Sequence, residues 1–484
     1  MTAFRHGVAS ADPLPDGVLL WTRCTTDGRG PVPVDWWVSP TAEASDVVAR
    51  GTAEASPEAD FTVDVDVRGL EPATSYWYGF RAGGTSSPVG RTRTAPDGPV
   101  ERLRVGLVSC AYWSCGFFNA YANLAARDVD LVVHVGDYLY ENDVMSRSRH
   151  AVRAQQPPGP LLTLADYRTR HAQYKTDADL QALHARHPIV AVWDDHELVG
   201  GTWRGGAGSH RPSHGDWRER TAGAVRAYFE WVPVRRRVPH SVYRTVRLGP
   251  LADLVMLDTR LTGRDRPATS GAPAVRILDP GRSLLGEEQW AWLEDEVRAS
   301  RARWVLVGNQ VMQAPLRALN VAGGLGLNPG QWDGYPAERE RFYDTFRAAG
   351  RSSNVAVMTG DIHSSWAADL PVGAEFITPS VTTDSFARTV LPAVPGASAL
   401  ARRIFLSQNR HLRLADLDRH GYVVLDVTPE RLQADWWHVD TITRRDPGER
   451  WGGGWWLADG QRGLRRADAP APFSRAPTSG PSPR

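Results

Sequence analysis

The stretch of sequence that decides the fold covers residues 131–140 and reads Leu131-Val132-Val133-His134-Val135-Gly136-Asp137-Tyr138-Leu139-Tyr140. Its first half is a short apolar run, which is typical of a strand buried on both faces of a sheet. Its second half turns polar at once, because Gly136 and Asp137 directly follow Val135. A buried strand that ends in this way indicates an α/β sheet with chemistry at its carboxyl edge.

Similar apolar runs recur along the chain and alternate with helical stretches. They lie at 103–108, 131–135, 189–193, 254–257, 304–307 and 355–358. Between them, residues 163–166 resemble a helix-capping box, and residues 286–299 have the apolar spacing of a helix. Two later runs, 422–427 and 432–439, form a predicted hairpin. This alternation predicts an α/β domain over residues 99–466.

The first 98 residues have a different pattern. Short β-type runs are separated there by Gly, Pro and Asp turn signals, and they lie at 18–22, 32–38, 61–67 and 76–81. The segment 69–78 is similar to the turn and strand of an immunoglobulin or fibronectin III sandwich. We therefore expect an N-terminal immunoglobulin-like domain over 1–98, with a linker at 94–99. The tail 467–484, rich in Pro, Ser and Arg, is expected to be disordered.

Composition restricts the functions that this chain can have. The 484 residues carry 56 Lys and Arg against 55 Asp and Glu, a balance that disfavours a general nucleic-acid binder. Lys175 is the one lysine, so the other 55 cations are arginine. No run of about 18 apolar residues is present, so no transmembrane helix is expected. The first residues also lack the charged and apolar regions of a signal peptide, which leaves a cytoplasmic location or an export signal outside this sequence.

The three cysteines need separate interpretations, because an odd number excludes a disulfide framework that uses them all. Cys24 and Cys115 are interpreted as small buried structural residues. Cys110 differs from them because it directly follows the predicted strand 103–108. At that position it becomes a candidate metal ligand.

Polar side chains follow five of the predicted strands. The residues are Ser109-Cys110, Gly136-Asp137 with Tyr140 and Glu141, Asp194-Asp195-His196-Glu197, Gly308-Asn309-Gln310 and Gly360-Asp361-Ile362-His363. In open α/β sheets, ligands bind outside the carboxyl ends of the strands. Core packing does not explain such a convergence, because charged groups are almost never buried unpaired.

These residue types are ligands for metal ions. Carboxylate and amide oxygens suit Ca²⁺, Mg²⁺ or Mn²⁺, and a phenolate such as that of Tyr140 favours Fe³⁺. A metal deprotonates a coordinating thiol outright, so Cys110 would contribute a thiolate. One carboxylate that bridges two ions would let them share a hydroxide, as two-metal phosphoesterases do. By residue type alone, Mn, Zn and Mg stay open beside Fe and Ca.

Motifs of one known family occur in order along nearly the whole chain outside the tail. They are His6-Gly7-Val8-Ala9-Ser10-Ala11-Asp12-Pro13, Leu20-Trp21-Thr22-Arg23, Gly136-Asp137-x-x-Tyr140, Trp193-Asp194-Asp195-His196-Glu197, Leu257-Asp258-Thr259-Arg260, Gly360-Asp361-x-His363 and Gly421-Tyr422-x-Val424. With these motifs the chain resembles the PhoD-like alkaline phosphatase/phosphodiesterase family of the calcineurin-like metallophosphoesterases. The resemblance implies a four-layer αββα sandwich with an N-terminal immunoglobulin- or fibronectin III-like β-sandwich.

The resemblance also implies a site that holds Fe³⁺ and Ca²⁺. The residues carried over are Cys110, Tyr140 and His363 for iron, Asp137 as the bridge, Asp195 and Asp361 for calcium, and Asn309 as a weaker candidate on the calcium side. His196 would not bind a metal itself. It would lie next to the metal ligands, where it would stabilise the leaving oxygen or give it a proton. From its residue type, Arg260 is either a surface cation or a phosphate clamp. Asp194 is either a structural carboxylate or part of the metal chemistry.

Two features depart from the family pattern. An asparagine or aspartate is expected shortly after the motif 194–197, but the chain has Gly200 and Gly201 there, which puts an additional calcium or substrate contact in doubt. The twin-arginine export signal typical of the family is missing, although the resemblance implies an extracellular, periplasmic or cell-envelope location. Long loops at 144–162 and 316–332 are expected to cover a site.

The predicted function is hydrolysis of phosphate esters, mainly diesters and to some degree monoesters, through a metal-bound hydroxide. The expected partner is a phosphate-ester substrate, with no obligate nucleic-acid partner, and the chain is expected to be a monomer. Two alternatives stay open. One is a strict phosphomonoesterase resembling purple acid phosphatases, in which Ser109-Cys110 would replace an early Asp-x-His. The other is a non-catalytic binding module built around the β-sandwich.

Overall fold

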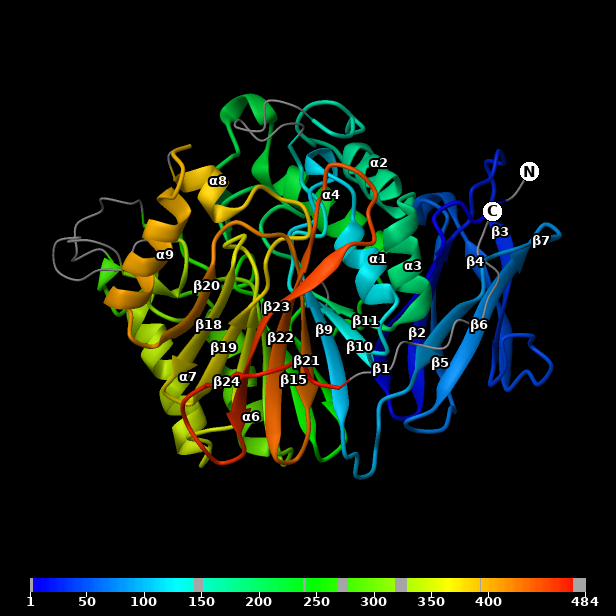
Figure 1. Cartoon of the computed structure of the whole chain (residues 1–484). Coiled ribbons are helices and arrows are strands. Elements are labelled where there is room, and N and C mark those ends of the chain that lie inside the picture. The colour runs from blue at the N-terminus through cyan, green and yellow to red at the C-terminus, as the bar shows by residue number, and fades with distance from the viewer. Residues whose placement is uncertain are drawn as a thin grey trace.

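The structure is a computed structural model, and it describes residues 3–142, 151–237, 241–268, 277–317, 329–391 and 393–472. Two large sheets face each other at the centre of the molecule, and helices lie on their outer sides (Figure 1). Buried apolar residues from both sheets form one continuous core. A hydrogen bond also crosses between the sheets, because the indole of Trp436 donates to the carbonyl of Ile377 at 2.9 Å.

One sheet has ten strands among the described residues. Its order is β24 (Arg465–Ala467), β23 (Glu449–Ala458), β22 (Arg431–Val439), β21 (Gly421–Val427), β9 (Leu103–Val108), β10 (Leu131–His134), β11 (Ile189–Ala191), β1 (Val8–Leu14), β2 (Gly17–Arg23) and β5 (Thr62–Arg68). Strands β9, β10, β11 and β1 are parallel, so their carboxyl ends lie at one edge. The predicted hairpin is confirmed as the antiparallel pair β21 and β22.

The facing sheet has seven strands in the described part of the chain. Its order is β14 (Arg244–Leu248), β15 (Ala252–Met256), β16 (Trp304–Asn309), β17 (Val355–Thr359), β19 (Gly373–Ile377), β18 (Ser365–Leu370) and β20 (Leu412–Asp416). Along β16, Trp304 and Leu306 belong to the core between the sheets, whereas Val305 and Val307 belong to the core under the outer helices. This burial on both faces explains why the strand is continuously apolar.

Helices cover the outer faces of both sheets. They are α1 (Asn119–Ala125), α2 (Leu164–Lys175), α3 (Ala178–Arg186), α4 (Trp217–Trp231), α6 (Glu287–Ala299), α7 (Pro336–Ala348), α8 (Phe386–Val390) and α9 (Ala397–Gln408). Helix α1 packs on β21 and β22, and α3 packs on β1. Residues of α6, α7 and α9 share a core with the seven-stranded sheet. The predicted four-layer αββα arrangement is therefore confirmed.

The capping box predicted at 163–166 is present at the start of α2. Thr163 Oγ1 accepts the Asp166 N–H at 3.2 Å, and Asp166 accepts the Thr163 N–H at 2.8 Å. Short elements are also present in the described part of the chain: the β12 (Thr202–Trp203) and β13 (Gly206–Ala207) pair, and the 3₁₀ helices η1 (Pro57–Ala59), η2 (Trp113–Cys115), η3 (Pro212–His214) and η5 (Trp332–Gly334).

The N-terminal strands are divided between two sheets. Strands β1, β2 and β5 extend the ten-stranded sheet, where Ala11 pairs with Ile189 of β11. The second N-terminal sheet has the order β4 (Ala49–Ala55), β3 (Val32–Ser39), β6 (Ser75–Ala82) and β7 (Thr85–Ser86), with β8 (Gly90–Arg93) also paired to β6. Buried residues from both groups of N-terminal strands pack together in a separate apolar core. The N-terminal antiparallel β-structure is confirmed, while the predicted boundary at residue 98 stays a prediction.

The ordered chain extends beyond the predicted start of the tail at 467. The Ala471 N–H donates to Asp435 at 2.9 Å, and the Gln433 amide donates to the Ala469 carbonyl at 3.0 Å. Residues 467–472 are therefore packed, and the rest of the predicted disordered tail lies outside the described residues. The predicted covering loops also fall partly outside them. No helix in the described ranges is long and apolar enough to cross a membrane.

Candidate metal centre

The polar residues predicted at the strand ends meet where the two sheets face each other. Cys110 follows β9, Asp137 follows β10 and Asp195 follows β11 of the ten-stranded sheet. Asp361 and His363 follow β17 of the seven-stranded sheet. Cys110, Asp137 and Asp195 are buried, and Asp361 and His363 are half-buried. The carboxyl ends of parallel strands thus supply the site from both sides.

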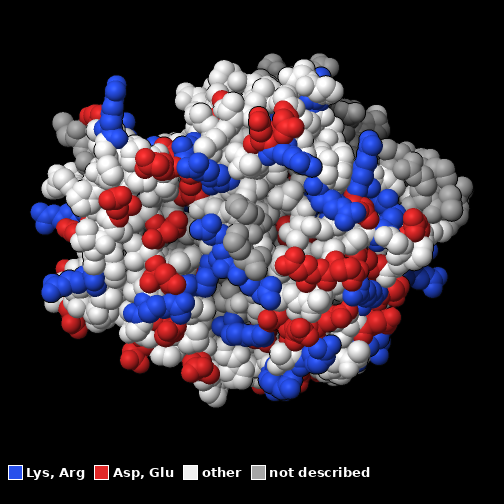
Figure 2. Space-filling view, turned by 180° about the vertical axis from the view of Figure 1, so that it is seen from behind, with Lys and Arg blue, Asp and Glu red and all other residues white. Residues whose placement is uncertain are grey.

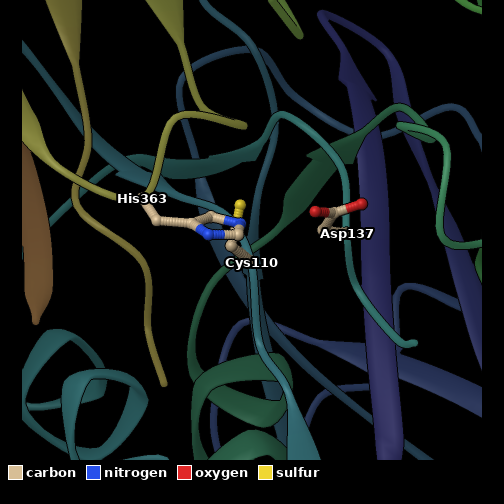
Figure 3. A group of neighbouring side chains, drawn as sticks. All are labelled: Cys110, Asp137 and His363. Atoms are coloured by element: carbon tan, nitrogen blue, oxygen red, sulfur yellow. The ribbon is translucent and has the colours of Figure 1, made fainter. Parts of the chain in front are cut away.

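Three groups of side chains in the described part of the chain could hold a metal ion. They are Cys110, Asp137 and His363 (Figure 3); Asp137, Asp195 and His196; and Asp194, Asp195 and Asp361. In each group, one ligand atom per residue lies within 4.8 Å of the others. Asp137 and Asp195 each belong to two groups, so their carboxylates connect neighbouring groups. The structure brings these residues together, while their individual roles stay predictions.

Four of these residues have the left-handed backbone conformation, which residues other than glycine rarely adopt. The φ angles are +61° at Cys110, +55° at Asp137, +61° at Asp361 and +51° at His363. Each such residue costs about 1–3 kcal/mol, and such positions cluster at functional sites. Backbone hydrogen bonds hold the turns, since the Cys110 N–H donates to Gly136 at 3.2 Å. The surrounding fold therefore imposes the positions of these ligands.

Two glycines let the strand-end turns approach each other. A Cβ at Gly136, where φ is +104°, would lie 2.4 Å from the backbone nitrogen of Asp194. A Cβ at Gly360 would lie 2.5 Å from Ser109 Oγ. The first contact joins two turns of the ten-stranded sheet, and the second joins the two sheets. A side chain fits at neither position without a shift of its neighbours.

Tyr140 connects Asp137 to His363. Its hydroxyl donates to Asp137 Oδ2 at 2.8 Å and lies 3.3 Å from His363 Nε2. The ring packs between Tyr112 and His196, with centroid distances of 4.4 and 4.2 Å. This packing holds the phenol oxygen beside the first ligand group.

Burial and mutual repulsion shift the pKa values of these ligands. Burial, together with neighbouring carboxylates, raises the pKa of Asp137 to about 7. Burial and the charge of Asp137 raise the pKa of the Cys110 thiol and of the Tyr140 phenol well above their usual ranges. Burial lowers the pKa of His363 to about 4. Without a cation the thiol and phenol keep their protons, and a bound cation would favour the deprotonated forms.

The donor atoms fit two different cations. The thiol, carboxylate and imidazole of the first group, with the adjacent phenol of Tyr140, suit a transition metal. The all-carboxylate group of Asp194, Asp195 and Asp361 suits a hard cation such as Ca²⁺. Buried carboxylates this close repel each other, and a cation would remove that cost. Metal binding at this edge is therefore supported, whereas the donor types leave the identity of the metals open.

His196 is held by a carboxylate to which the sequence assigned no role. Its Nδ1 lies 2.6 Å from Glu141 Oε2, and Glu141 is fully buried. The other oxygen of Glu141 accepts the Gly200 N–H at 2.7 Å. Burial lowers the pKa of His196, but Glu141, Asp137 and Asp195 outweigh burial, so the pKa is raised well above its usual value. Without a cation the imidazole is therefore protonated beside the candidate ligands.

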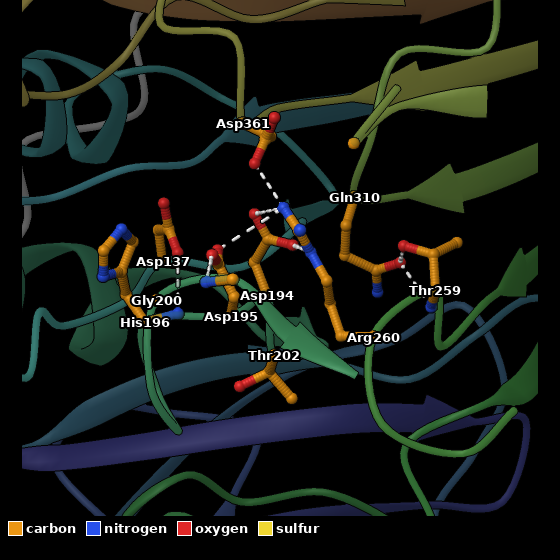
Figure 4. A network of polar contacts seen from close by, with 12 residues as sticks. Asp137, Asp194, Asp195, His196, Gly200, Thr202, Thr259, Arg260, Gln310 and Asp361 are labelled. Atoms are coloured by element: carbon orange, nitrogen blue, oxygen red, sulfur yellow. Dashed lines mark hydrogen bonds and ion pairs between the residues drawn. The ribbon is translucent and has the colours of Figure 1, made fainter. Parts of the chain in front are cut away.

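Arg260 lies among the carboxylates, so its interpretation as a surface cation is wrong (Figure 4). The residue is 4% exposed, and its guanidinium forms a two-armed ion pair with Asp194 and another ion pair with Asp361. Its Nη2 lies 3.4 Å from Asp195 Oδ1. Because Arg260 follows β15 and Asp194 follows β11, this ion pair also joins the two sheets.

Asn309 ends β16, but its hydrogen bonds lie away from the carboxylates. Its amide nitrogen donates to the Thr359 hydroxyl at 3.1 Å, and its oxygen accepts the indole N–H of Trp332 at 3.1 Å. The predicted role as a calcium ligand stays a prediction that these contacts do not favour. Gln331, which carries no recognisable signal in the sequence, donates to Asp361 instead.

Backbone contacts that were not predicted also organise the site. Glu197 accepts the N–H of Tyr138 at 2.6 Å and that of Asp194 at 2.8 Å, which ties the turns after β10 and β11 together. The N–H of Gly201 donates to Asp195. The glycines that depart from the family pattern thus supply backbone donors. Glu197 is the last residue of the motif 194–197, so the sequence already pointed to it as a site residue. Nothing in the sequence indicates the contact that Gly201 makes.

Comparisons with known proteins agree with this geometry. A family model described as PhoD-like phosphatase matches residues 105–436, and a model of the N-terminal domain of PhoD-like phosphatases matches residues 1–96. The chain belongs to the PhoD-like phosphatase family. The resemblance found in the sequence is thereby confirmed, and so is the predicted enzyme class of phosphoric ester hydrolases.

Individual relatives of this PhoD-like phosphatase match nearly its whole length. Alkaline phosphatase D of Bacillus subtilis (strain 168) is 36% identical over 472 residues, which cover 92% of this chain and 79% of that protein. A solved structure described as "Structure of PhoD" superposes with a TM-score of 0.88 at 33% identity, covering 97% of this chain and 92% of that chain. This similarity supports the same fold from the first strands to the last.

Proposed function

We propose that this PhoD-like protein hydrolyses phosphate diesters, and monoesters to a lesser degree, at a centre of two metal ions. Membership of the family supports the reaction class. The support for two ions comes from Asp137, which belongs to two neighbouring ligand groups. A carboxylate in that position can bridge two cations.

The two cations would differ because their donors differ. Cys110, Tyr140 and His363 would hold Fe³⁺, since a phenolate is a strongly donating ligand for a trivalent ion. Asp195 and Asp361 would hold Ca²⁺, since carboxylate oxygens suit a hard divalent ion. When bound, the two ions would supply an activated water and neutralise the phosphoryl oxygens.

Residues of the chain itself would position the ester and protonate its leaving group. His196, kept protonated by Glu141, would give a proton to the leaving oxygen. Arg260 would act as a positioning residue, in place of the predicted phosphate clamp. Two arms of its guanidinium are already paired with Asp194, and that pair holds the turns of the two sheets together.

The preference for diesters follows from the charge of the site. A diester carries one negative charge, whereas a phosphate monoester with a second pKa of about 6 carries about 1.5–2 at pH 7. Two described cations beside the ligand groups, Arg260 and His196, are paired with carboxylates, whereas Arg264, which acts on Asp195, is bonded to backbone carbonyls. The charges of Fe³⁺ and Ca²⁺ would be offset by the five anionic ligands Cys110, Asp137, Tyr140, Asp195 and Asp361, so a monoanionic diester would suit this site better than a dianion.

Removal and return of metals test the two-ion centre. Chelation of Ca²⁺ is expected to abolish turnover of bis-p-nitrophenyl phosphate, and added Ca²⁺ to restore it. Anomalous scattering with elemental analysis is expected to find iron beside Cys110 and calcium beside Asp195. Activity that survives complete metal removal would refute the mechanism. Mn or Zn at these positions would refute only the metal assignment.

Two small substrates separate the proposed diesterase from the alternatives. The holoenzyme is expected to have a kcat/KM about tenfold higher for bis-p-nitrophenyl phosphate than for p-nitrophenyl phosphate. A ratio below one would favour the strict phosphomonoesterase. A non-catalytic binding module would turn over neither substrate, and its ligand binding would survive metal loss.

Tyr140→Phe tests the phenolate. Iron-loaded protein is expected to show a visible phenolate-to-iron charge-transfer band, which the variant should lose or shift. Tyr112→Phe is a matched control, because Tyr112 stacks on Tyr140 but its own hydroxyl lies 3.3 Å from the Asn142 carbonyl. An unchanged spectrum in iron-loaded Tyr140→Phe would remove Tyr140 from the ligands.

A further inference from the structure

A cavity separate from the candidate metal ligands is lined by arginine. Its volume is about 290 Å³, and five arginines line it: Arg235, Arg236, Arg237, Arg244 and Arg247. None of the candidate metal ligands is among its lining residues. In the view from behind, Lys and Arg side chains gather near the middle of the molecule (Figure 2). The whole chain has a net charge of only +1, so this concentration of positive charge is local.

The cavity lies between an element of each large sheet. Residues 235–237 follow α4 as three consecutive arginines. Arg244 and Arg247 belong to β14, the edge strand of the seven-stranded sheet, and Asp12 belongs to β1 of the ten-stranded sheet. The walls are therefore fixed by the packing of the sheets.

Two of the five arginines, Arg244 and Arg247, form two ion-pair contacts each with carboxylates. Arg244 forms a two-armed ion pair with Asp12, at 2.8 and 2.6 Å. Arg247 pairs with Asp253 at 2.6 Å and with Glu296 at 2.5 Å. These side chains form rigid walls and add little free charge.

The run after α4 supplies the free charge. Arg236 and Arg237 are exposed, and neither has a carboxylate oxygen of the described residues within 4.0 Å, although Asp64 attracts Arg236 from a greater distance. Each guanidinium instead lies near an aromatic ring, 5.1 Å from the centroid of Phe229 for Arg236 and 5.9 Å from that of Tyr243 for Arg237. Such contacts orient a guanidinium without neutralising it.

Arg235 adds donors that lack a partner. One of its Nη atoms pairs with Asp66. Its Nε and its other Nη are buried and have no hydrogen-bond partner within the described part of the chain. A buried donor left unpaired is unfavourable, the more so when it is charged, so an acceptor in this cavity would be favoured.

We propose that this cavity binds a phosphate-bearing anion, at a site separate from the metal centre. Guanidinium groups recognise phosphate through two parallel N–H bonds, which makes converging arginines specific for this chemistry. The volume of about 290 Å³ is at the small end of ligand sites, so it suits a phosphate group with a short organic portion. The phosphate comes either from free inorganic phosphate or from a second phosphoryl group of a longer substrate.

Binding to the metal-loaded enzyme tests the site without turnover. Calorimetric titration with inorganic phosphate is expected to show two binding events in the wild type, one at the metal centre and one in the cavity. The double variant Arg236→Gln/Arg237→Gln is expected to keep the first event and to weaken the second by about tenfold or more. Arg402→Gln/Arg403→Gln is the matched control, because these are adjacent exposed arginines of α9, and it should keep both events.

Steady-state kinetics distinguish the two sources of phosphate. If the occupant belongs to the substrate, the double variant loses kcat/KM by about tenfold for a substrate with two phosphodiester groups, while its turnover of bis-p-nitrophenyl phosphate is unchanged. If the occupant is free phosphate, both substrates are turned over normally and only the second binding event is lost. Phosphate binding and kinetics that are both unchanged, or that change equally in the control, would refute the site. The binding result is independent of the proposed hydrolysis.

Discussion

Glu141 is the residue that orients the imidazole of His196 and raises its pKa. Its side chain is fully buried, with one oxygen on His196 Nδ1 and the other on the Gly200 N–H. A buried carboxylate needs such partners, and its charge in turn favours the imidazolium. Loss of that charge should weaken the proposed proton donation from His196 to the leaving group.

Glu141→Gln is expected to lower kcat for alkyl phosphodiesters by about a hundredfold, because a general acid contributes about 10²–10⁴ in rate. The loss should be much smaller for p-nitrophenyl esters, whose leaving group departs without a proton. Steady-state assays with both classes of substrate check this difference. Equal losses with both leaving groups would assign Glu141 a structural role only.

Lys175, the one lysine of the chain, is buried in the wall between α2 and the N-terminal strands. It is 2% exposed, and its Nζ lies 4.2 Å from the centroid of the Trp21 ring with no hydrogen-bond partner in the described ranges. Burial lowers its pKa from 10.5 to about 7. The folded state therefore binds fewer protons than the unfolded state between these values. The cost to stability is fully present below about pH 7 and disappears as the pH rises towards 10.5.

Lys175→Met is expected to raise the Tm at pH 7 and to flatten the rise of Tm between pH 7 and about 10. Lys175→Arg should lower the Tm across this range, because a guanidinium cannot lose its proton. Thermal unfolding of the three proteins over this pH range provides the measurement. A lower Tm for Lys175→Met at pH 7 would mean that the ammonium stabilises the fold.

At the scale of elements, the turns that follow the strands determine the geometry of the site. The turn after β10 needs glycine at 136 for two reasons, a φ of +104° and a Cβ position only 2.4 Å from the Asp194 nitrogen. The same turn places Asp137, and Glu197 ties it to the turn after β11. A change in this turn should therefore affect both stability and metal binding.

Gly136→Ala is expected to lower the free energy of unfolding by about 3 kcal/mol or more, because overpacking adds to the backbone strain, and to reduce the bound metal. Gly350→Ala is the matched control, since its φ is +73° but no atom lies within 4 Å of the added Cβ. That control should cost only about 1 kcal/mol. Chemical unfolding and metal analysis of both variants test the comparison. Equal losses of unfolding free energy in the two variants would show that the turn after β10 can shift to make room for the added methyl group.

At the scale of the whole molecule, the two large sheets are joined by buried polar contacts as well as by the apolar core. The Asp12–Arg244 ion pair connects β1 of one sheet to β14 of the other, and its side chains are 2% and 6% exposed. The Arg260–Asp194 pair makes a second connection, at the candidate metal centre. Relative movement of the sheets would break both pairs, so the fold and the site share these contacts.

Asp12→Asn is expected to reduce the free energy of unfolding by about 3–5 kcal/mol, because it leaves Arg244 buried with an unbalanced charge. Asp16→Asn removes an exposed partner of Arg68 at 3.2 Å and should cost less than about 1 kcal/mol. Denaturant unfolding of the two variants measures the difference. Similar costs would show that the sheets do not depend on the buried pair.

Much of the fold was predictable because its signals are local. The strand 103–108 has the same bounds in the structure, and the capping box at Thr163 forms as its residues indicate. The apolar runs indicated strands that are buried on both faces. The polar residues after them indicated the carboxyl edge of the sheets, where the candidate ligands lie. Strands β1, β2 and β5 also extend the ten-stranded sheet, and the pairing of β1 with β11 joins distant segments, which local patterns do not reveal.

The sequence by itself determined the family, the layers and the residues that meet at the candidate metal centre, because strand periodicity and strand-end motifs depend on neighbouring positions. Only the tertiary structure decided how those side chains are paired. Arg260 is held by Asp194 and Asp361, Glu141 orients His196, and Asn309 bonds to Trp332. Each of these contacts joins segments that are distant in sequence or lie on different turns. Their geometry depends on how the two sheets and their turns pack, which no stretch of sequence specifies alone.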